Sequence, residues 1–221
     1  LFRFILTCIG LGLLLGVVLA MIGIYRGIVV DALTVVRSHK VDLWVVEAGT
    51  RGPFAEASRI PGDTREAIAR LSGVTEVGAV TYQSVEAVHG QSKLRLYVIG
   101  YDLGRPGGPE RIVEGRGIGR RHFEMVADRR TGLAPGDRID LGRNRFNVVG
   151  LTEEQVASGG DPVVYISLLD SQKLQFDISP PAARVQLARG ANGASRDTVN
   201  AVLARVHPNV PPARVADTAR R

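Results

Sequence analysis

The residues of this sequence that could do chemistry are four histidines, two adjacent glutamates and one serine in a glycine-rich segment. The histidines are His39, His89, His122 and His207. None of them has a second metal-binding side chain at the spacing of a metal site, so each is expected at the surface or at a strand end. Glu153 and Glu154 would point to different faces of a helix or strand, so we expect a solvated loop there and no acid–base pair. Ser158 has no base near it in the sequence, and nothing indicates a nucleophile.

No nucleotide-binding loop is found in the sequence. No segment matches the GxxxxGK[ST] pattern of a P-loop. In GRGIGRR (115–121), Gly115, Gly117 and Gly119 simply alternate, and a strand follows where a dinucleotide loop would open a helix. We therefore expect turn glycines here. The sequence predicts no catalytic, cofactor-binding or metal-binding residue in this chain, which we expect not to be an enzyme.

Basic residues moderately outnumber acidic residues, and both are spread evenly along the sequence. Lys and Arg total 28 against 22 for Asp and Glu, a formal net charge of +6, with no run of five like charges. A nucleic-acid-binding chain gathers its cations on one face, so we expect no nucleic-acid partner. The single cysteine, Cys8, excludes a disulfide within the chain and argues against thiol catalysis.

A stretch without any charge covers residues 4–24. A helix of this length spans about 30 Å, the thickness of a bilayer's hydrocarbon core. Arg3 precedes the stretch, and Tyr25 and Arg26 follow it, as at membrane interfaces. The alternatives are a buried core helix and a cleaved signal peptide, but a signal peptide has only about 7–15 apolar residues. ILTC is similar to a lipoprotein cleavage box, yet the apolar region follows its cysteine. We predict an uncleaved transmembrane helix over residues 4–25.

Small residues recur every four positions in this helix, at Gly12, Gly16 and Ala20, with Gly23 and Gly27 on nearly the same side. Such a stripe lets the backbone of another helix approach closely. We predict that it is a packing face for other transmembrane helices. After the span, apolar residues at helical spacing predict that the helix continues as an amphipathic stalk to residue 40.

Residues 41–102 are predicted to form β-α-β-β. DLWVVEA is a strand by its β-branched and aromatic content, in which Trp44 is expected to pack instead of anchoring at the membrane interface. After the loop GTRGPFAEASRIPG, Asp63 and Glu66 indicate the start of a helix that Gly73 ends. VTEVGAVTYQSVEAV follows as one long strand or two broken strands, and KLRLYVIGYD alternates as a further strand.

Residues 182–221 are predicted to repeat the order strand, helix, strand. ARVQLARG (183–190) alternates as a strand, and Ser195 can begin a helix whose apolar residues have helical spacing. These residues are Val199, Val202, Leu203 and Val206. A proline turn and a short strand are expected in HPNVPPARVADT. Two such units pair into a split βαβ layer with helices on one face.

Residues 103–181 are predicted to form a small, mostly β subdomain inserted into that layer. FEMVADRRTGLAPGDRIDLGRNRFNVVGLTEE fits a strand, a helical turn, a strand and a strand, with PGD and GRN as turns. DPVVYISLLDSQKLQF adds a strand and a helix begun by Ser167 and Asp170. The predicted fold class is therefore α+β, with a transmembrane helix and stalk over 1–40 ahead of the split βαβ layer.

The order of these parts resembles the amino-terminal half of an ABC transporter permease of the MacB/FtsX-like class, which includes the DevC-type exporters. The most specific stretches are DLWVVEAGTRGPF, ADRRTGLAPGDRIDLGRNRFNVVGL and DPVVYISLLDSQKL. The resemblance covers essentially the whole chain. It implies a MacB-like periplasmic core domain with a porter-like layer and a smaller inserted subdomain.

The resemblance also implies partners and a location. Such permeases have four transmembrane helices, work as a dimer of permease copies, and are driven by a separate or fused ABC-type ATPase, so ATP is expected on that partner and not here. The domain after residue 40 is expected on the extracytoplasmic side of the bacterial inner membrane, where GTRGPF or loops of the insertion could contact a periplasmic adaptor protein. Motion from the ATPase would pass through the first helix to the outer domain and move a lipid-like, peptide or polyketide-type cargo.

Leu1 at the start and the lack of a second span lead us to expect a fragment of a longer permease. The alternative hypothesis is a stand-alone, membrane-anchored binding or adaptor protein. Whether GTRGPF is a contact site or a turn stays open, although a turn is favoured.

Overall fold

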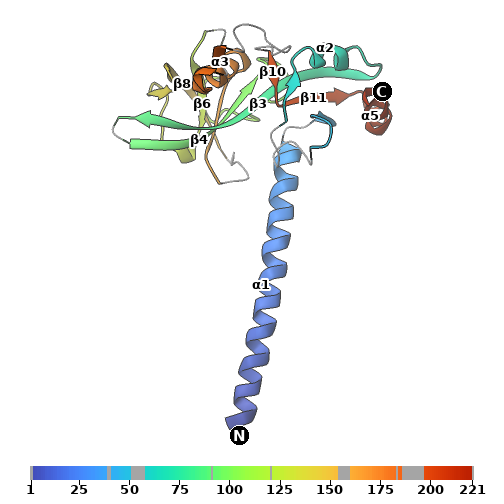
Figure 1. Ribbon diagram of the computed structural model, residues 1–221, viewed down its shortest axis with the longest axis vertical. Helices are drawn as coiled ribbons and strands as arrows, with labels where there is room; N and C mark the ends of the chain where they lie inside the picture. The colour runs from blue at the N-terminus through green and yellow to red at the C-terminus, as the bar shows by residue number, and fades with distance from the viewer. Residues whose placement is uncertain are drawn as a thin grey trace. The chain divides into compact units, whose positions relative to one another are not determined.

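The computed structural model describes residues 2–38, 41–50, 58–90, 92–119, 121–153, 160–182, 184–185 and 197–220. Two compact units divide the chain, one ending at Ser38 and the other beginning at His39. Each unit is described by itself below (Figure 1).

The first unit is a single helix, α1 (Phe2–Ser38). Its part Phe2–Gly27 has a mean hydropathy of 2.7 and buries none of its residues, so it is not a core helix of this chain. It is long and apolar enough to cross a membrane. The predicted continuation of the helix beyond residue 25 is confirmed. The side chains of residues 30–38 lie outside the described part, so the amphipathic character of the stalk stays a prediction.

The second unit combines strands and helices, which confirms the predicted α+β class. Its strands are β1 (Leu43–Val45), β2 (Ile60–Pro61), β3 (Val74–His89), β4 (Ser92–Tyr101), β5 (Glu114–Gly115), β6 (Glu124–Asp128), β7 (Arg138–Leu141), β8 (Asn144–Thr152), β9 (Val163–Ser167), β10 (Thr198–Val199) and β11 (Ala201–Val206). Its helices are α2 (Thr64–Ala69), the single turn η1 (Arg129–Thr131), α3 (Leu168–Ile178) and α5 (Pro212–Ala219).

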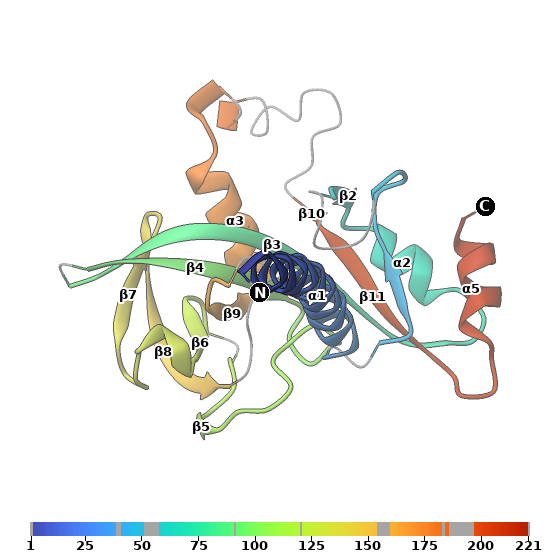
Figure 2. The ribbon, with the colours of Figure 1, turned by 90° about the horizontal axis from the view of Figure 1, so that it is seen from below.

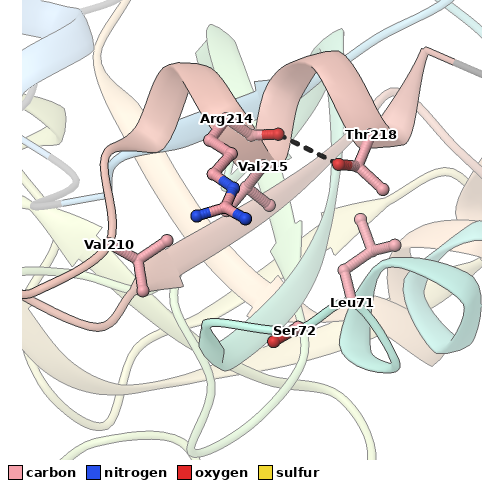
Figure 3. A pocket seen from close by; sticks show the side chains of 6 residues that line it. All are labelled: Leu71, Ser72, Val210, Arg214, Val215 and Thr218. Atoms are coloured by element: carbon pink, nitrogen blue, oxygen red, sulfur yellow. Dashed lines mark hydrogen bonds between the residues drawn. The ribbon is translucent and has the colours of Figure 1, made fainter.

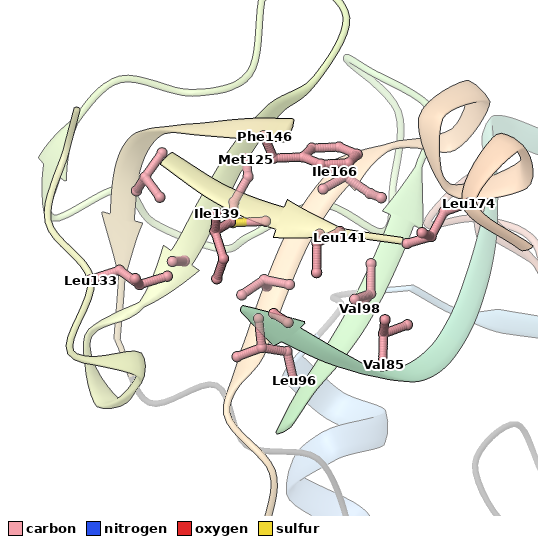
Figure 4. Close-up of a cluster of buried hydrophobic side chains, with 14 of the residues drawn as sticks. Val85, Leu96, Val98, Met125, Leu133, Ile139, Leu141, Phe146, Ile166 and Leu174 are labelled. Carbon is pink, nitrogen blue, oxygen red and sulfur yellow. The ribbon is translucent and has the colours of Figure 1, made fainter. Parts of the chain in front are cut away.

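Six of the strands close into a small barrel. The main sheet runs β1-β11-β3-β4-β9-β6-β8-β5, and β7 pairs with both β3 and β8. The ring β3-β4-β9-β6-β8-β7 is thereby complete, which removes the free edges of these strands. Inward-pointing side chains of the six strands fill the barrel, and Leu174 of α3 joins them (Figure 4). The largest are Phe146, Met125, Leu96, Ile139, Leu141 and Ile166.

The other end of the sheet is open and consists of β1, β11 and the first half of β3. Along β11 the side chains alternate, as the two-residue period of a strand requires. Val202 and Ala204 pack with Ile68 of α2 on one face, whereas Leu203 packs with Val80 on the other face. Figure 2 shows β3 and β4 running from the barrel strands toward the end that carries α2, β11 and α5.

Strand β3 belongs to both regions. Residues 74–80 pair with β11, whereas residues 80–89 pair with β4. The barrel core accordingly takes side chains from both sides of the predicted boundary at residue 102, with Val85 and Leu96 before it and Phe146 after it. The boundaries at residues 102 and 181 stay predictions, but the barrel cannot assemble without β3 and β4.

The predicted helix after Ser195 is wrong. Ser195 itself lies outside the described residues, and residues 198–206 form β10 and β11. The apolar spacing fits a helix, but a strand buried on both faces also has a nearly continuous apolar sequence, and the two cannot be told apart by periodicity. Pairing with β1 and β3 decides the outcome.

The short strand predicted at the end of HPNVPPARVADT is also wrong, because the segment forms α5 with proline in its first turn. Of the strand predicted over 183–190, only Arg184 and Val185 are described, and both are helical. Most of the loop GTRGPF likewise lies outside the described residues.

The expected strand after Gly73 and the expected helices after Asp63 and Ser167 are confirmed. β3 is one unbroken strand of 16 residues. The Ser167 side chain caps α3 by accepting a hydrogen bond from the Asp170 backbone N–H at 3.1 Å. α2 begins after Asp63 as predicted, although the Asp63 side chain makes no capping hydrogen bond.

Candidate functional site: the first and last strands

The structure keeps most of the residues considered for chemistry apart. No group of three or more His, Cys, Asp or Glu side chains that could hold a metal is found among the described residues. His89 lies 3.9 Å from Asp137, and Glu153 accepts a hydrogen bond from Arg111 at 2.6 Å. His39, Glu154 and Ser158 lie outside the described residues.

His122 is the histidine with a buried acidic partner. Its Nδ1 lies 2.9 Å from Asp170, whose carboxylate also accepts hydrogen bonds from the Phe123 backbone N–H and the Ser167 hydroxyl. Phe123 has φ +62°, a left-handed conformation that is unusual for a large side chain. The Asp170 carboxylate thus fixes a strained turn onto α3, which is a structural use of both residues.

The glycine-rich segment GRGIGRR contacts the barrel strands β6 and β8. Gly115 has φ +74°, and a Cβ there would collide with the backbone of β8. The two terminal nitrogens of the Arg116 guanidinium, Nη1 and Nη2, donate to the buried Glu124 carboxylate, and the Gly119 N–H donates to it at 2.7 Å. The glycine at 115 is therefore required by close backbone approach within β5, whereas the sequence led us to expect a turn glycine there.

Glu124 makes stability depend on pH. The hydrogen bonds from Arg116 hold the pKa of Glu124 below its usual range, and the Gly119 N–H acts in the same direction against the effect of burial. Because this pKa is lower in the folded protein than in the unfolded chain, where it is about 4.3, the stabilisation is complete above that pH and is lost as pH falls toward the folded value. We expect Glu124→Gln to lower the melting temperature at pH 7 and to flatten its decline between pH 5 and pH 3. Glu86→Gln, at an exposed position of β3, is the control and should keep the wild-type decline; an unchanged acid limb in Glu124→Gln would contradict the assignment.

The candidate functional site is the pairing of the first strand, β1, with the last strand, β11. Leu43 pairs with Ala204 and Val45 with Val202 in an antiparallel register. The Asp42 N–H donates to the Ala204 carbonyl at 3.0 Å, and the Asp42 carboxylate accepts from the Val206 N–H at 2.8 Å. The start of β1 and the end of β11 are therefore side by side in the folded domain, and α5 follows β11.

Asn200 ties this strand pair to β3. Its side-chain carbonyl accepts from the Tyr82 N–H at 2.8 Å, and its side-chain amide donates to the Ser58 carbonyl at 2.6 Å. The Ser58 hydroxyl in turn accepts from the N–H of Glu47, two residues after β1, at 2.8 Å. Through Asn200, the segment that follows β1 is fastened to the central strand of the domain.

We expect Asn200→Ala to lower the free energy of unfolding by about 2 kcal/mol, because it removes two hydrogen bonds and leaves two backbone groups without partners. Denaturant unfolding of the full chain measures this loss. Asn209→Ala is the matched control, since Asn209 is exposed and its side chain makes no hydrogen bond within the described chain. Equal stability of the two variants would show that Asn200 does not fasten the strands.

Trp44 packs in the strand pair as the sequence predicted. It contacts the cluster that contains Val80, Tyr101 and Leu203. Tyr101 and Leu203 are buried on this face, and burial raises the pKa of Tyr97 and of Tyr101 to about 12. A shift of β1 would therefore disturb a packed core and not a flexible surface.

The predicted helix-packing residues lie on a free surface of α1. A Cβ added at Gly12 or Gly16 would meet nothing within 4 Å, and Ala20 is exposed. The stripe has room for another helix, and its role stays a prediction.

Sequence reasoning did not find Asp42, Ser58 and Asn200. An Asp just before a strand and an Asn between two short strands are weak signals, because both residues are common in turns. Their roles depend on partners far away in sequence, up to 164 residues for Asp42 and Val206.

Comparisons with known proteins agree on one family. The model of the family described as MacB-like periplasmic core domain matches residues 4–221. The uncharacterized ABC transporter permease Rv0072 of Mycobacterium tuberculosis is 30% identical over 178 residues, which are 80% of this chain and 50% of the relative. A second permease of that organism, Rv2563, is 25% identical over 183 residues, 83% of this chain and 52% of the relative. The chain thus spans about half the length of the curated relatives it matches.

The fold is similar to that of a MacB periplasmic region. The crystal structure of the periplasmic region of MacB from Actinobacillus actinomycetemcomitans matches with a TM-score of 0.50 and 12% identity, covering 72% of this chain and 71% of that chain. At this identity the likeness concerns the fold alone.

Proposed function

This chain belongs to the MacB-like periplasmic core domain family, and from this we propose that it is the amino-terminal part of an ABC transporter permease subunit. The resemblance to MacB/FtsX-like permeases that the sequence indicated is confirmed by the family match and the permease relatives. In the proposed function, the domain transmits ATPase-driven motion from α1 to the barrel and thereby moves a substrate.

The observation that carries the proposal is the continuity of the strands. Only His39 and Lys40 separate the end of α1 from Val41, and β1 follows at Leu43. β1 pairs with β11, β11 pairs with the first half of β3, and the second half of β3 is a strand of the barrel. Hydrogen-bonded strands resist extension, so a displacement of β1 would be passed along this path instead of being absorbed in loops.

The proposed partners and location follow from the family. We expect an ABC-type ATPase subunit that hydrolyses ATP, a second permease copy, and a periplasmic adaptor protein in some systems. The helix-packing residues Gly12, Gly16 and Ala20 are the proposed contacts for other transmembrane helices. The domain after residue 40 is proposed to lie on the extracytoplasmic side of the bacterial inner membrane.

The single tryptophan of this sequence offers a direct test, because Trp44 lies in the strand that would receive the motion. A ¹⁹F-labelled tryptophan at position 44 of the permease is reconstituted in nanodiscs with its ATPase. We expect a non-hydrolysable ATP analogue to shift the ¹⁹F resonance, since β1 moves against the packed face around Val80 and Leu203.

An ATPase variant unable to bind nucleotide is the control and should leave the resonance in place. An unchanged resonance with the active ATPase would contradict motion at β1. Failure of the chain to associate with any ATPase would favour the alternative, a membrane-anchored binding or adaptor protein.

A further inference from the structure

A pocket lies between α5 and the turn that joins α2 to β3. Its volume is about 240 Å³, and it is lined by Leu71, Ser72, Val210, Arg214, Val215 and Thr218. Figure 3 shows the side chains of α5 and of the α2–β3 turn facing each other across it. Neither the strand pairing nor the barrel uses this pocket.

The pocket combines an apolar floor with a cation. Val215 is buried, Leu71 packs against the cluster around Ile68, and Val210 approaches the backbone at Gly73. Arg214 extends from α5 on the same side as Val215, toward Ser72 (Figure 3). The charge and the apolar surface therefore face the same space.

The Arg214 guanidinium is available to a ligand. No carboxylate lies within ion-pair distance of it in the described part of the chain, whereas Arg220 on the same helix pairs with Asp217 at 3.7 Å. The Thr218 hydroxyl is engaged, since it donates to the Arg214 carbonyl at 3.0 Å. Ser72 is exposed at the opposite side and supplies a further hydroxyl donor.

We propose that this pocket binds a small monocarboxylate with a short apolar chain. A guanidinium binds a carboxylate through two parallel hydrogen bonds, and the Ser72 hydroxyl can donate a third. The alkyl chain would cover Leu71, Val210 and Val215 and exclude water from them. The volume is below the roughly 300–1,000 Å³ of pockets for drug-sized ligands, which favours a small ligand. The bound anion would fasten α5, the helix that follows β11, to α2. This inference does not depend on the proposed transport function.

Hexanoate is a suitable probe, and hydrogen exchange of the full chain in nanodiscs of neutral lipid is the readout. A ligand that binds only the closed form, at a concentration of about ten times its dissociation constant, lowers the population of the locally open form about tenfold. Hydrogen exchange through that form slows by the same factor. We expect this slowing at the amides of residues 213–219 with hexanoate, and little with hexan-1-ol, which lacks the charge, or with acetate, which lacks the chain.

Two variants test the residues. Arg214→Gln should weaken hexanoate binding about fivefold, the effect of losing a solvent-exposed ion pair. Arg220→Gln removes the same charge from the same helix away from the pocket and should bind as wild type. Thr218→Trp, which fills the pocket and keeps Arg214, should abolish the protection.

The proposal is overturned if hexan-1-ol protects as well as hexanoate, or if Arg214→Gln binds hexanoate as wild type does. It is equally overturned if hexanoate has no effect and only discs of anionic lipid slow the exchange, since the occupant would then be a lipid headgroup.

Discussion

Phe146→Ala is expected to lower the free energy of unfolding by about 3–5 kcal/mol, the range for removing a buried aromatic side chain. Phe146 is 1% exposed at the centre of the barrel, and its ring meets that of Phe123 edge to face at a centroid distance of 5.4 Å. A cavity at this place cannot collapse easily, because six hydrogen-bonded strands fix the surrounding wall.

The loss of stability in Phe146→Ala is expected to extend beyond the barrel strands. Because β3 belongs to both the barrel and the open sheet, we expect the amides of β11 to exchange faster in Phe146→Ala, together with those of β8. Hydrogen exchange and denaturant unfolding of the full chain measure this. Val88→Ala, at a 44% exposed position of the same barrel, is the control and should change stability by about 0.5 kcal/mol or less. Faster exchange confined to the strands of residues 103–181 would mean that the insertion folds as a separate domain.

Insertion of a short Gly-Ser linker between His39 and Lys40 is expected to abolish the response of Trp44 to nucleotide. A Gly-Ser segment behaves as a flexible coil, so it would absorb a displacement of α1 before β1 receives it. The contacts of Asp42 with Ala204 and Val206 lie beyond the insertion and are left intact, so the stability of the domain should not change.

The ¹⁹F resonance at position 44 and the ATPase activity of the reconstituted complex together measure this uncoupling. We expect hydrolysis to continue while the resonance stops responding. The same linker placed after Gly90, in the exposed turn between β3 and β4, is the matched control and should leave the response unchanged. A persistent response with the linker after His39 would show that motion reaches the domain by another path.

Local patterns in the sequence determined a large part of this protein. The apolar stretch predicted α1, because the length and lack of charge of a membrane-spanning helix are visible in one segment. Strict alternation and turn residues predicted β4, β7 and β8, and the capping pair Ser167 and Asp170 predicted the start of α3. Each of these depends on residues that are neighbours in the chain.

The tertiary structure decided what depends on distant partners. The apolar residues after Asn200 suit a helix or a buried strand, and only pairing with β1 and β3 makes them β11. Barrel closure depends on β7 meeting β3, which lies about fifty residues earlier (Leu141 opposite Ala87). The roles of Asp42 and Asn200 likewise arise from hydrogen bonds between segments more than a hundred residues apart. Such contacts leave no local pattern, because any short polar residue can make them once the fold has brought the segments together.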